Sequence, residues 1–171
     1  ACRQIEVRIM KYEDIDSENR IWSALIPKRT KYDEFRLDKY ITDPLKQVID
    51  EAQSLKPKRL SDTPYVFPAR NGDKSICETA IRKLMKKYPR QGDNGKITMH
   101  GFRSTFMAWS MNNEKNDLAV ERELSHTVGG GKSKTVGVNP AVRRAYDRDD
   151  LFHVRKDIAI EYADFVTSEV R

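Results

Sequence analysis

The alternation of apolar and polar positions predicts the end of a helix followed by a small antiparallel sheet near the start of the chain. Residues 1–10 carry isoleucines on one helical face, and residues 12–16 suit a short strand. Residues 21–26 form an apolar run, and residues 35–41 alternate between apolar and polar side chains, the period of a half-buried strand. The lysine-rich stretch 27–34 is expected to join these two strands as a hairpin.

Most of the remaining sequence predicts helices. The expected helices are one that begins with the cap Asp43 and Pro44, one at 75–88, one capped by Thr98, one at 116–126, a short one opened by Asn139 and Pro140, and one at 149–170. The apolar side chains expected to face the core are Leu45, Val48, Ile49, Ala52, Leu55, Val66, Phe67, Ile81, Leu84, Met85, Phe102, Phe106, Trp109, Leu151, Val154, Ile158, Tyr162 and Phe165. Loops are expected at 56–73 and 89–96. The predicted fold class is mainly α with a small antiparallel β-sheet at one edge (α+β).

The composition fits one globular domain with a basic surface. The chain has 171 residues, of which 38% are hydrophobic and 34% charged, and its net charge is +6. A basic domain suits an anionic partner, and the phosphate backbone of nucleic acid is the commonest one. Cys2 and Cys77 do not lie at metal-ligand spacing and are expected to be reduced thiols. The sequence shows neither an apolar run of membrane-spanning length nor a signal-peptide pattern.

A set of side chains spread along the sequence has the chemistry needed to break and rejoin a phosphodiester. Arg3 and Arg103 can each grip two phosphate oxygens with a guanidinium fork. His100 and His126 can move protons near neutral pH, and the phenol of Tyr146 can act as a covalent nucleophile. Because His100 and Arg103 are three residues apart, a helix would place them on one face. Taken singly, each short pattern also fits solvent-exposed side chains without a chemical role.

Four stretches, taken in order, resemble the catalytic domain of the tyrosine recombinases, the phage-integrase family. The sequence Thr-Met-His-Gly-Phe-Arg-Ser-Thr-Phe at 98–106 resembles the second motif of that family, especially in integrases of prophages and genomic islands. The sequence Ala-Cys-Arg-Gln-Ile-Glu-Val at 1–7 resembles the first motif, although Ile5 stands where a small residue is usual. Glu-Leu-Ser-His at 123–126 resembles the third histidine position, and Arg-Arg-Ala-Tyr-Asp-Arg at 143–148 resembles the nucleophile motif.

The resemblance implies a role for each of these side chains. Arg3 and Arg103 would bind the scissile phosphate, and His126 would donate a hydrogen bond to one of its oxygens. Tyr146 would attack phosphorus to form a 3′-phosphotyrosine, while His100 assists the transfer of the tyrosine proton. The covalent bond conserves the phosphodiester energy, so no ATP is needed. The resemblance implies no metal ion or other cofactor, and the sequence has no carboxylate cluster at metal-ligand spacing.

The general acid that protonates the leaving 5′ oxygen is expected in the hairpin at 27–34. The family uses a lysine there, and Lys31 lies closest to its position when the following strand is aligned, with Lys28 as the alternative. A role for either lysine in binding the DNA backbone alone is also open. Glu6 would support Arg3 rather than act in catalysis. The other basic residues expected to contact DNA are Lys28, Arg29, Arg143, Arg144 and Arg148.

The connection between His126 and Tyr146 departs from the family pattern because it is much longer than usual. The excess lies in the glycine- and lysine-rich stretch 129–139, which we interpret as a mobile tether. An ordered surface loop without a mechanistic role is the alternative. His153 falls on the last expected helix and is interpreted as structural, and that helix would either pack within the chain or dock on a neighbouring protomer.

As a whole, the resemblance implies that residues 1–171 form the C-terminal catalytic domain of a longer integrase, whose N-terminal DNA-binding domain is not part of this chain. The expected partner is double-stranded DNA, bound by a homo-tetramer of the full-length protein. The expected location is the bacterial cytoplasm, with a prophage or mobile element as the source and no contact with a membrane. Two alternatives are a DNA-binding module without strand-transfer activity, from a decayed or truncated integrase, and a topoisomerase-like nicking and closing enzyme.

Overall fold

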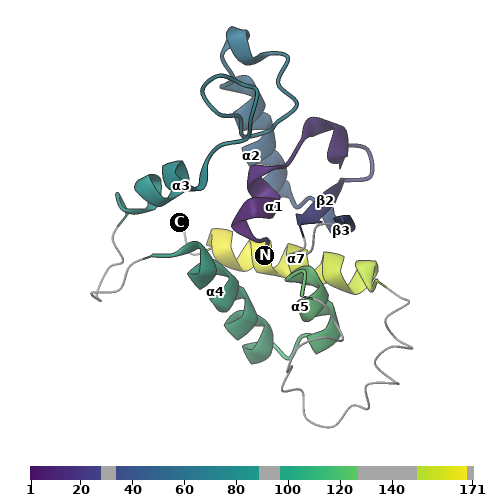
Figure 1. The fold of residues 1–171 in the computed structure, drawn as a ribbon. Coiled ribbons are helices and arrows are strands. Elements are labelled where there is room, and N and C mark those ends of the chain that lie inside the picture. The colour runs from purple at the N-terminus through teal and green to yellow at the C-terminus, as the bar shows by residue number, and fades with distance from the viewer. Residues whose placement is uncertain (28–33, 89–96, 127–149, 169–171) are drawn as a thin grey trace.

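The computed structural model describes residues 1–27, 34–88, 97–126 and 150–168 (Figure 1). Within these ranges the chain forms six α-helices and one three-stranded antiparallel sheet. The predicted class, mainly α with a small sheet at one edge, is therefore confirmed. None of the helices in these ranges is both long and apolar enough to cross a membrane.

The sheet contains β1 (Ile15–Asp16), β2 (Ile21–Pro27) and β3 (Glu34–Tyr40), in that order, with antiparallel neighbours. In β2 every second residue is buried, as the alternation predicts, and Ala24 lies opposite Leu37 of β3. The predicted strand at 12–16 is wrong over its first three residues. Residues Tyr12–Asp14 form a 3₁₀ turn instead, because the backbone bridges to the loop at 64–66 before it enters the sheet.

The sheet packs into the first of two hydrophobic clusters. Helix α1 (Gln4–Arg8) and helix α2 (Asp43–Ser54) lie against it, and the predicted anchor Val66 is buried between them. The buried members of this cluster are Met10, Trp22, Ala24, Ile26, Leu37, Ile41, Ile49 and Val66. The backbone N–H of Val66 donates to the Met10 carbonyl at 3.0 Å, so the long loop after α2 is fixed to the start of the chain.

The second cluster is formed by α4 (Met99–Asn112), α5 (Asp117–Glu123) and α7 (Phe152–Ser168). Figure 1 shows α7 crossing the middle of the molecule, with α4 and α5 on one side of it and the sheet on the other. The buried residues are Phe106, Ala119, Val120, Leu124 and Ile158. The ring of Phe106 meets Tyr162 of α7 edge to face, with 4.9 Å between ring centroids. Ala1 packs against this cluster, so the chain start lies beside α4 and α5.

Local capping explains where these helices begin. Thr98 is the N-cap of α4, and its Oγ1 accepts a hydrogen bond from the backbone N–H of Gly101 at 3.0 Å. Asn116 caps α5 by accepting from the N–H of Ala119 at 3.0 Å. The cap Thr98 was predicted from the sequence, and Asn116 lies at the predicted start of its helix. For α2 the prediction is wrong by one residue, because Thr42 is the N-cap and Asp43 is already helical.

Several side chains predicted to face the core are exposed instead. They are Val48, Leu55, Leu84, Phe102, Val154 and Phe165. On α4 the buried positions are Arg103, Phe106 and Ser110, so the buried face is centred on the arginine and Phe102 turns toward solvent. On α3 (Glu78–Met85) no residue is fully buried, because this short helix lies at the edge of the described structure (Figure 1).

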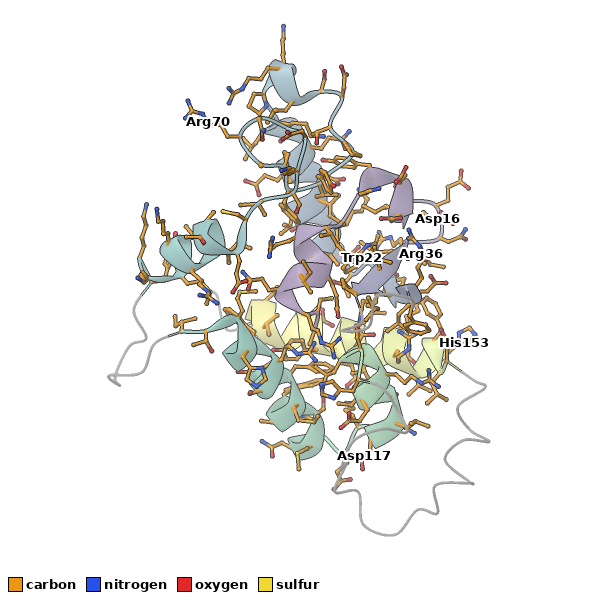
Figure 2. All side chains as sticks on the ribbon, in the orientation of Figure 1. Asp16, Trp22, Arg36, Arg70, Asp117 and His153 are labelled. Atoms are coloured by element: carbon orange, nitrogen blue, oxygen red, sulfur yellow. The ribbon has the colours of Figure 1, made fainter. Side chains whose placement is uncertain are left out.

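The predictions for the hairpin tip, the loop at 89–96, the glycine-rich stretch and the short helix after Pro140 fall on 28–33, 89–96 and 127–149, outside the described residues. The predicted helix at 149–170 begins only at Phe152, after Leu151 with a φ of 53°. His153 is exposed near the start of α7, where its ring contacts Phe152 (Figure 2). Cys2 and Cys77 are both free thiols.

Candidate phosphate-binding site

Helix α5 ends in a tight turn that presents His126. Ser125 adopts a left-handed backbone conformation, with φ of 54°. Its N–H donates to the carbonyl of Arg122 at 2.8 Å, and the N–H of His126 donates to the carbonyl of Glu121 at 3.0 Å. This pair of bonds is the Schellman motif, which closes a helix by reversing the chain over its last turn. The predicted helix end at His126 is therefore three residues late, and His126 is folded back onto α5.

The guanidinium of Arg103 is held in place by two backbone carbonyls from distant parts of the chain. Its Nη2 donates to the carbonyl of Leu124 at 2.6 Å, and its Nη1 donates to the carbonyl of Ala1 at 3.2 Å. Arg103 lies on α4 and is buried. Because these carbonyls belong to the end of α5 and the start of the chain, the arginine connects three segments and its orientation is fixed before any ligand binds.

His126 lies directly beside Arg103, with 3.0 Å between its Nε2 and Nη2 of the guanidinium. A guanidinium can only donate, so Nε2 of the imidazole accepts this hydrogen bond. The other ring nitrogen, Nδ1, lies 2.6 Å from Oε2 of Glu121 and donates to that carboxylate. These two contacts fit the tautomer that carries its proton on Nδ1, and both ring nitrogens are engaged.

Arg3 and Glu6 lie close enough to Arg103 to influence its charge. Arg3 is the N-cap of α1, and its backbone N–H donates to Oε2 of Glu6 at 2.9 Å. Its guanidinium Nη1 lies 3.9 Å from Oε1 of the same carboxylate, which is completely buried. The predicted support of Arg3 by Glu6 therefore has a physical basis, although Arg3 precedes the helix rather than lying within it.

The electrostatics show that these groups form one cluster. Burial lowers the pKa of Arg103, the carboxylate of Glu6 raises it, and the positive charge of Arg3 lowers it again. Two arginines therefore face a common region with one buried carboxylate between them. An anion placed there would relieve the repulsion between the arginines, as a phosphate does in arginine-lined sites.

His100 is exposed on the first turn of α4, two residues after the cap Thr98. The structure gives its side chain no contact with Arg103, so the predicted shared face rests on their spacing along the same helix. The remaining predicted site residues lie outside the described residues: Lys28, Arg29, Lys31, Arg143, Arg144, Tyr146 and Arg148. Their roles stay predictions.

A buried group of charges supports the end of α5 and was missed by the sequence analysis. Lys39 of β3 donates from Nζ to the backbone carbonyl of Glu123 at 2.5 Å and lies 3.3 Å from its Oε1. Arg155 of α7 donates from Nη1 to Oε2 of Glu123 at 3.2 Å and to the carbonyl of Asp38 at 2.7 Å. Burial alone would raise the pKa of Glu123, but the charges of Lys39 and Arg155 lower it. The carboxylate is therefore ionised and joins β3, α5 and α7.

The signal for this group was present in the sequence. Lys39 lies between Leu37 and Ile41 on the face of the strand that carries apolar side chains. Arg155 lies on the helical face that also carries Leu151 and Ile158. A charged residue in the buried phase of an amphipathic pattern indicates an internal ion pair, because an unpaired charge there is costly.

Comparison with known proteins agrees with the fold. Residues 1–129 match the sequence model described as the phage integrase family. The chain therefore belongs to the phage integrase family. Tyr146 lies beyond the matched residues.

Two curated relatives match across the whole chain. The integrase of Shigella phage Sf6 is 28% identical over 174 residues, covering 100% of this chain and 40% of that protein. The prophage integrase IntS of Escherichia coli (strain K12) is 27% identical over 173 residues, covering 99% of this chain and 40% of that protein. The chain thus spans about two fifths of the length of these relatives. A crystal structure of XerA recombinase has the same fold, with a TM-score of 0.53 and 17% identity, covering 86% of this chain and 53% of that one.

Proposed function

We propose that this chain is the catalytic domain of a site-specific DNA recombinase that cleaves and rejoins DNA strands through a 3′-phosphotyrosine. The observation that carries the proposal is the convergence on Arg103, in α4, of groups from two other segments of the chain. Arg3 and Glu6 come from the start of the chain, and His126 comes from the end of α5. Membership of the phage integrase family supports the same function.

The donors of Arg103 are suited to a phosphodiester. A guanidinium has five N–H bonds, and three of them point to the carbonyls of Ala1 and Leu124 and to the ring of His126. Within the described part of the chain, two donors of the group are left for an incoming ligand. An arginine held in this way can donate to a phosphate oxygen without first becoming ordered.

The proposed reaction begins when the hydroxyl oxygen of Tyr146 attacks phosphorus. The O–P bond to the tyrosine forms as the bond from phosphorus to the 5′ oxygen breaks. His100 accepts the phenol proton, and Lys31, with Lys28 as the alternative, protonates the leaving 5′ oxygen. Negative charge grows on the non-bridging oxygens, where Arg3, Arg103 and His126 would stabilise it. Attack by the 5′-OH of a partner strand on the phosphotyrosine then completes strand exchange.

A second candidate, a DNA-binding module without strand-transfer activity, is favoured by one observation. The chain spans only 40% of each curated relative, so groups needed for assembly on DNA can lie elsewhere in a longer protein. The proposed homo-tetramer on double-stranded DNA belongs to that longer protein. A location in the bacterial cytoplasm, and an origin in a prophage or mobile element, belong to the proposal as well.

The two candidates differ in a covalent product. The chain would be incubated with supercoiled plasmid in EDTA and quenched in SDS, and relaxed plasmid and protein-bound DNA would be measured. Product from the wild type, and none from Tyr146→Phe, is expected for the recombinase. Product from both proteins would contradict the role of Tyr146. Plasmid binding without product from either protein would support the DNA-binding module.

A further inference from the structure

Glu121 is connected to His126 by two separate hydrogen bonds. The Schellman turn brings the backbone N–H of His126 to the carbonyl of Glu121, and the imidazole Nδ1 reaches its carboxylate at 2.6 Å. The side chain of Glu121 is 22% exposed, whereas that of His126 is 41% exposed. The ring therefore has one edge against Glu121, one edge against Arg103, and solvent access from the side.

In the structure as it stands, His126 cannot donate a hydrogen bond to a phosphate. A phosphate oxygen needs a donor, but Nε2 carries a lone pair that already accepts from Arg103. For Nε2 to donate, the ring must gain a second proton and become an imidazolium. A neutral ring with its proton on Nδ1 reaches that state by taking one proton at Nε2, without turning over.

We propose that Glu121 is a positioning residue that fixes His126 with Nε2 toward the phosphate site and compensates the positive charge that the ring takes up when a phosphodiester binds. The inference rests on the proposed function, because it assigns Glu121 to the same phosphate site. On binding, Arg103 turns an N–H from Nε2 to a phosphate oxygen. Nε2 then takes a proton from solvent and donates it in a hydrogen bond to the phosphate.

The charged groups around the ring support this sequence of events. Glu121 faces it from α5 and Arg103 faces it from α4, while Arg3 and Glu6 of the α1 segment lie close enough to Arg103 to influence its charge. A phosphate brings negative charge to Arg103, after which the carboxylate of Glu121 and the phosphate flank the imidazolium.

An ordinary ion pair on the surface at a helix end would not fix the orientation of the histidine ring. An exposed Glu–His pair contributes little, and its removal changes little. Here the far edge of the same ring contacts a buried guanidinium, so the carboxylate fixes which nitrogen faces that guanidinium. The arrangement is the one in which a carboxylate orients a histidine from behind and sets its tautomer.

The test measures the protonation of the His126 ring directly. The Tyr146→Phe chain, in which the proposed chemistry is blocked, would be labelled with ¹⁵N, and long-range proton–nitrogen NMR spectra would be recorded at pH 7.5. Loss of one set of signals in His126→Gln would assign the ring. A neutral ring with Nδ1–H is expected in the free protein, and an imidazolium is expected with saturating duplex DNA.

Two matched variants separate positioning from charge alone. Glu121→Gln and Asp117→Asn each remove one carboxylate from α5, so they raise the net charge equally; Figure 2 shows Asp117 at the end of α5 far from α7. With DNA, the ring is expected to become charged in Asp117→Asn but to stay neutral in Glu121→Gln. In the Tyr146-containing chain, Glu121→Gln is expected to slow covalent attachment about tenfold, with duplex affinity changed less than about twofold.

The outcomes are decisive in both directions. A ring that stays neutral on DNA, or that becomes charged equally in Glu121→Gln, would overturn the inference. A free protein whose ring carries its proton on Nε2 would do the same. The proposed function is tested by a different measurement, the covalent product of the wild type. If that product is absent, the proposed function fails, but the NMR result for Glu121 still holds.

Discussion

Arg103 and His126 are 23 residues apart in the sequence, yet Nη2 of the guanidinium lies 3.0 Å from Nε2 of the imidazole. The contact joins α4 to the turn that follows α5. Arg103 also donates to the carbonyls of Leu124, in that turn, and of Ala1, at the start of the chain. The candidate phosphate-binding site is therefore held together by contacts within the chain. Such preorganisation favours an electrostatic catalyst, because the hydrogen bonds from Arg103 to the carbonyls of Ala1 and Leu124 do not have to be broken when a phosphate binds.

Arg103→Lys is expected to abolish measurable covalent attachment and to destabilise the fold. A lysine has one nitrogen in place of three, so it cannot serve the carbonyls of Ala1 and Leu124 and a phosphate together. Leaving a buried carbonyl without a donor costs about 1–3 kcal/mol in unfolding free energy. Urea unfolding and the SDS-quenched plasmid assay measure the two effects. Arg82→Lys on exposed α3 is the control, and an equal loss there would contradict the prediction.

Ser125 gives a test of the turn that presents His126. Its left-handed φ of 54° is free of strain for glycine and costly for a β-branched residue. Ser125→Gly is expected to leave stability unchanged or raise it by up to about 1 kcal/mol. Ser125→Val is expected to lower it by about 2 kcal/mol. Denaturant unfolding of both variants checks this, and a Val variant as stable as the Gly variant would show that the turn is not as described.

The buried charges around Glu123 predict a large cost for removing one partner. In Lys39→Met the carboxylate and carbonyl of Glu123 lose a buried donor, and the carboxylate keeps Arg155 and the amino group of Ala1 at 3.7 Å. Breaking such a buried pair costs about 3 kcal/mol of unfolding free energy. Lys46→Met, which removes an exposed lysine of α2 from a pair with Asp50, is expected to cost less than about 0.5 kcal/mol. Equal effects in the two variants would argue against the internal ion pairs.

The same carboxylate predicts a dependence of stability on pH. Burial would raise the pKa of Glu123, but Lys39 and Arg155 lower it below its ordinary value of 4.5. A group whose pKa is lower in the folded state contributes stability that is complete above the unfolded value and is lost as pH falls through the folded one. Stability is therefore expected to decline below about pH 4.5. In Glu123→Gln the difference between pH 7 and pH 4 should shrink, whereas in Glu13→Gln, at an exposed site, it should shrink less.

The elements that the sequence predicts well are those with a strong local signal. Alternation placed β2 and β3, and the capping residues Thr98 and Asn116 placed the starts of α4 and α5. Arg3, Arg103 and His126 were found through motif resemblance, and the structure brings them into one cluster.

What the sequence could not show depends on distant contacts. Phe102 has an apolar side chain at helical spacing, but only the tertiary packing of α4 decides that Arg103 takes the buried face. Glu121 is one of many acidic residues in the sequence. Its contact with His126 depends on the reversal of the chain at Ser125, which no local sequence pattern predicts. The sequence thus indicated three residues of the candidate site, Arg3, Arg103 and His126, but not the groups that hold them, and the roles of all three stay predictions.

The most direct test of the central claim is the chemical identity of the protein–DNA linkage. After reaction with plasmid in EDTA, the adduct would be digested with nuclease and protease, and the peptide carrying a nucleotide would be sequenced by mass spectrometry. The account predicts a 3′-phosphate linked to Tyr146, absent in Arg103→Ala. A nucleotide on another residue, or a Tyr146 adduct that forms equally in Arg103→Ala, would contradict it.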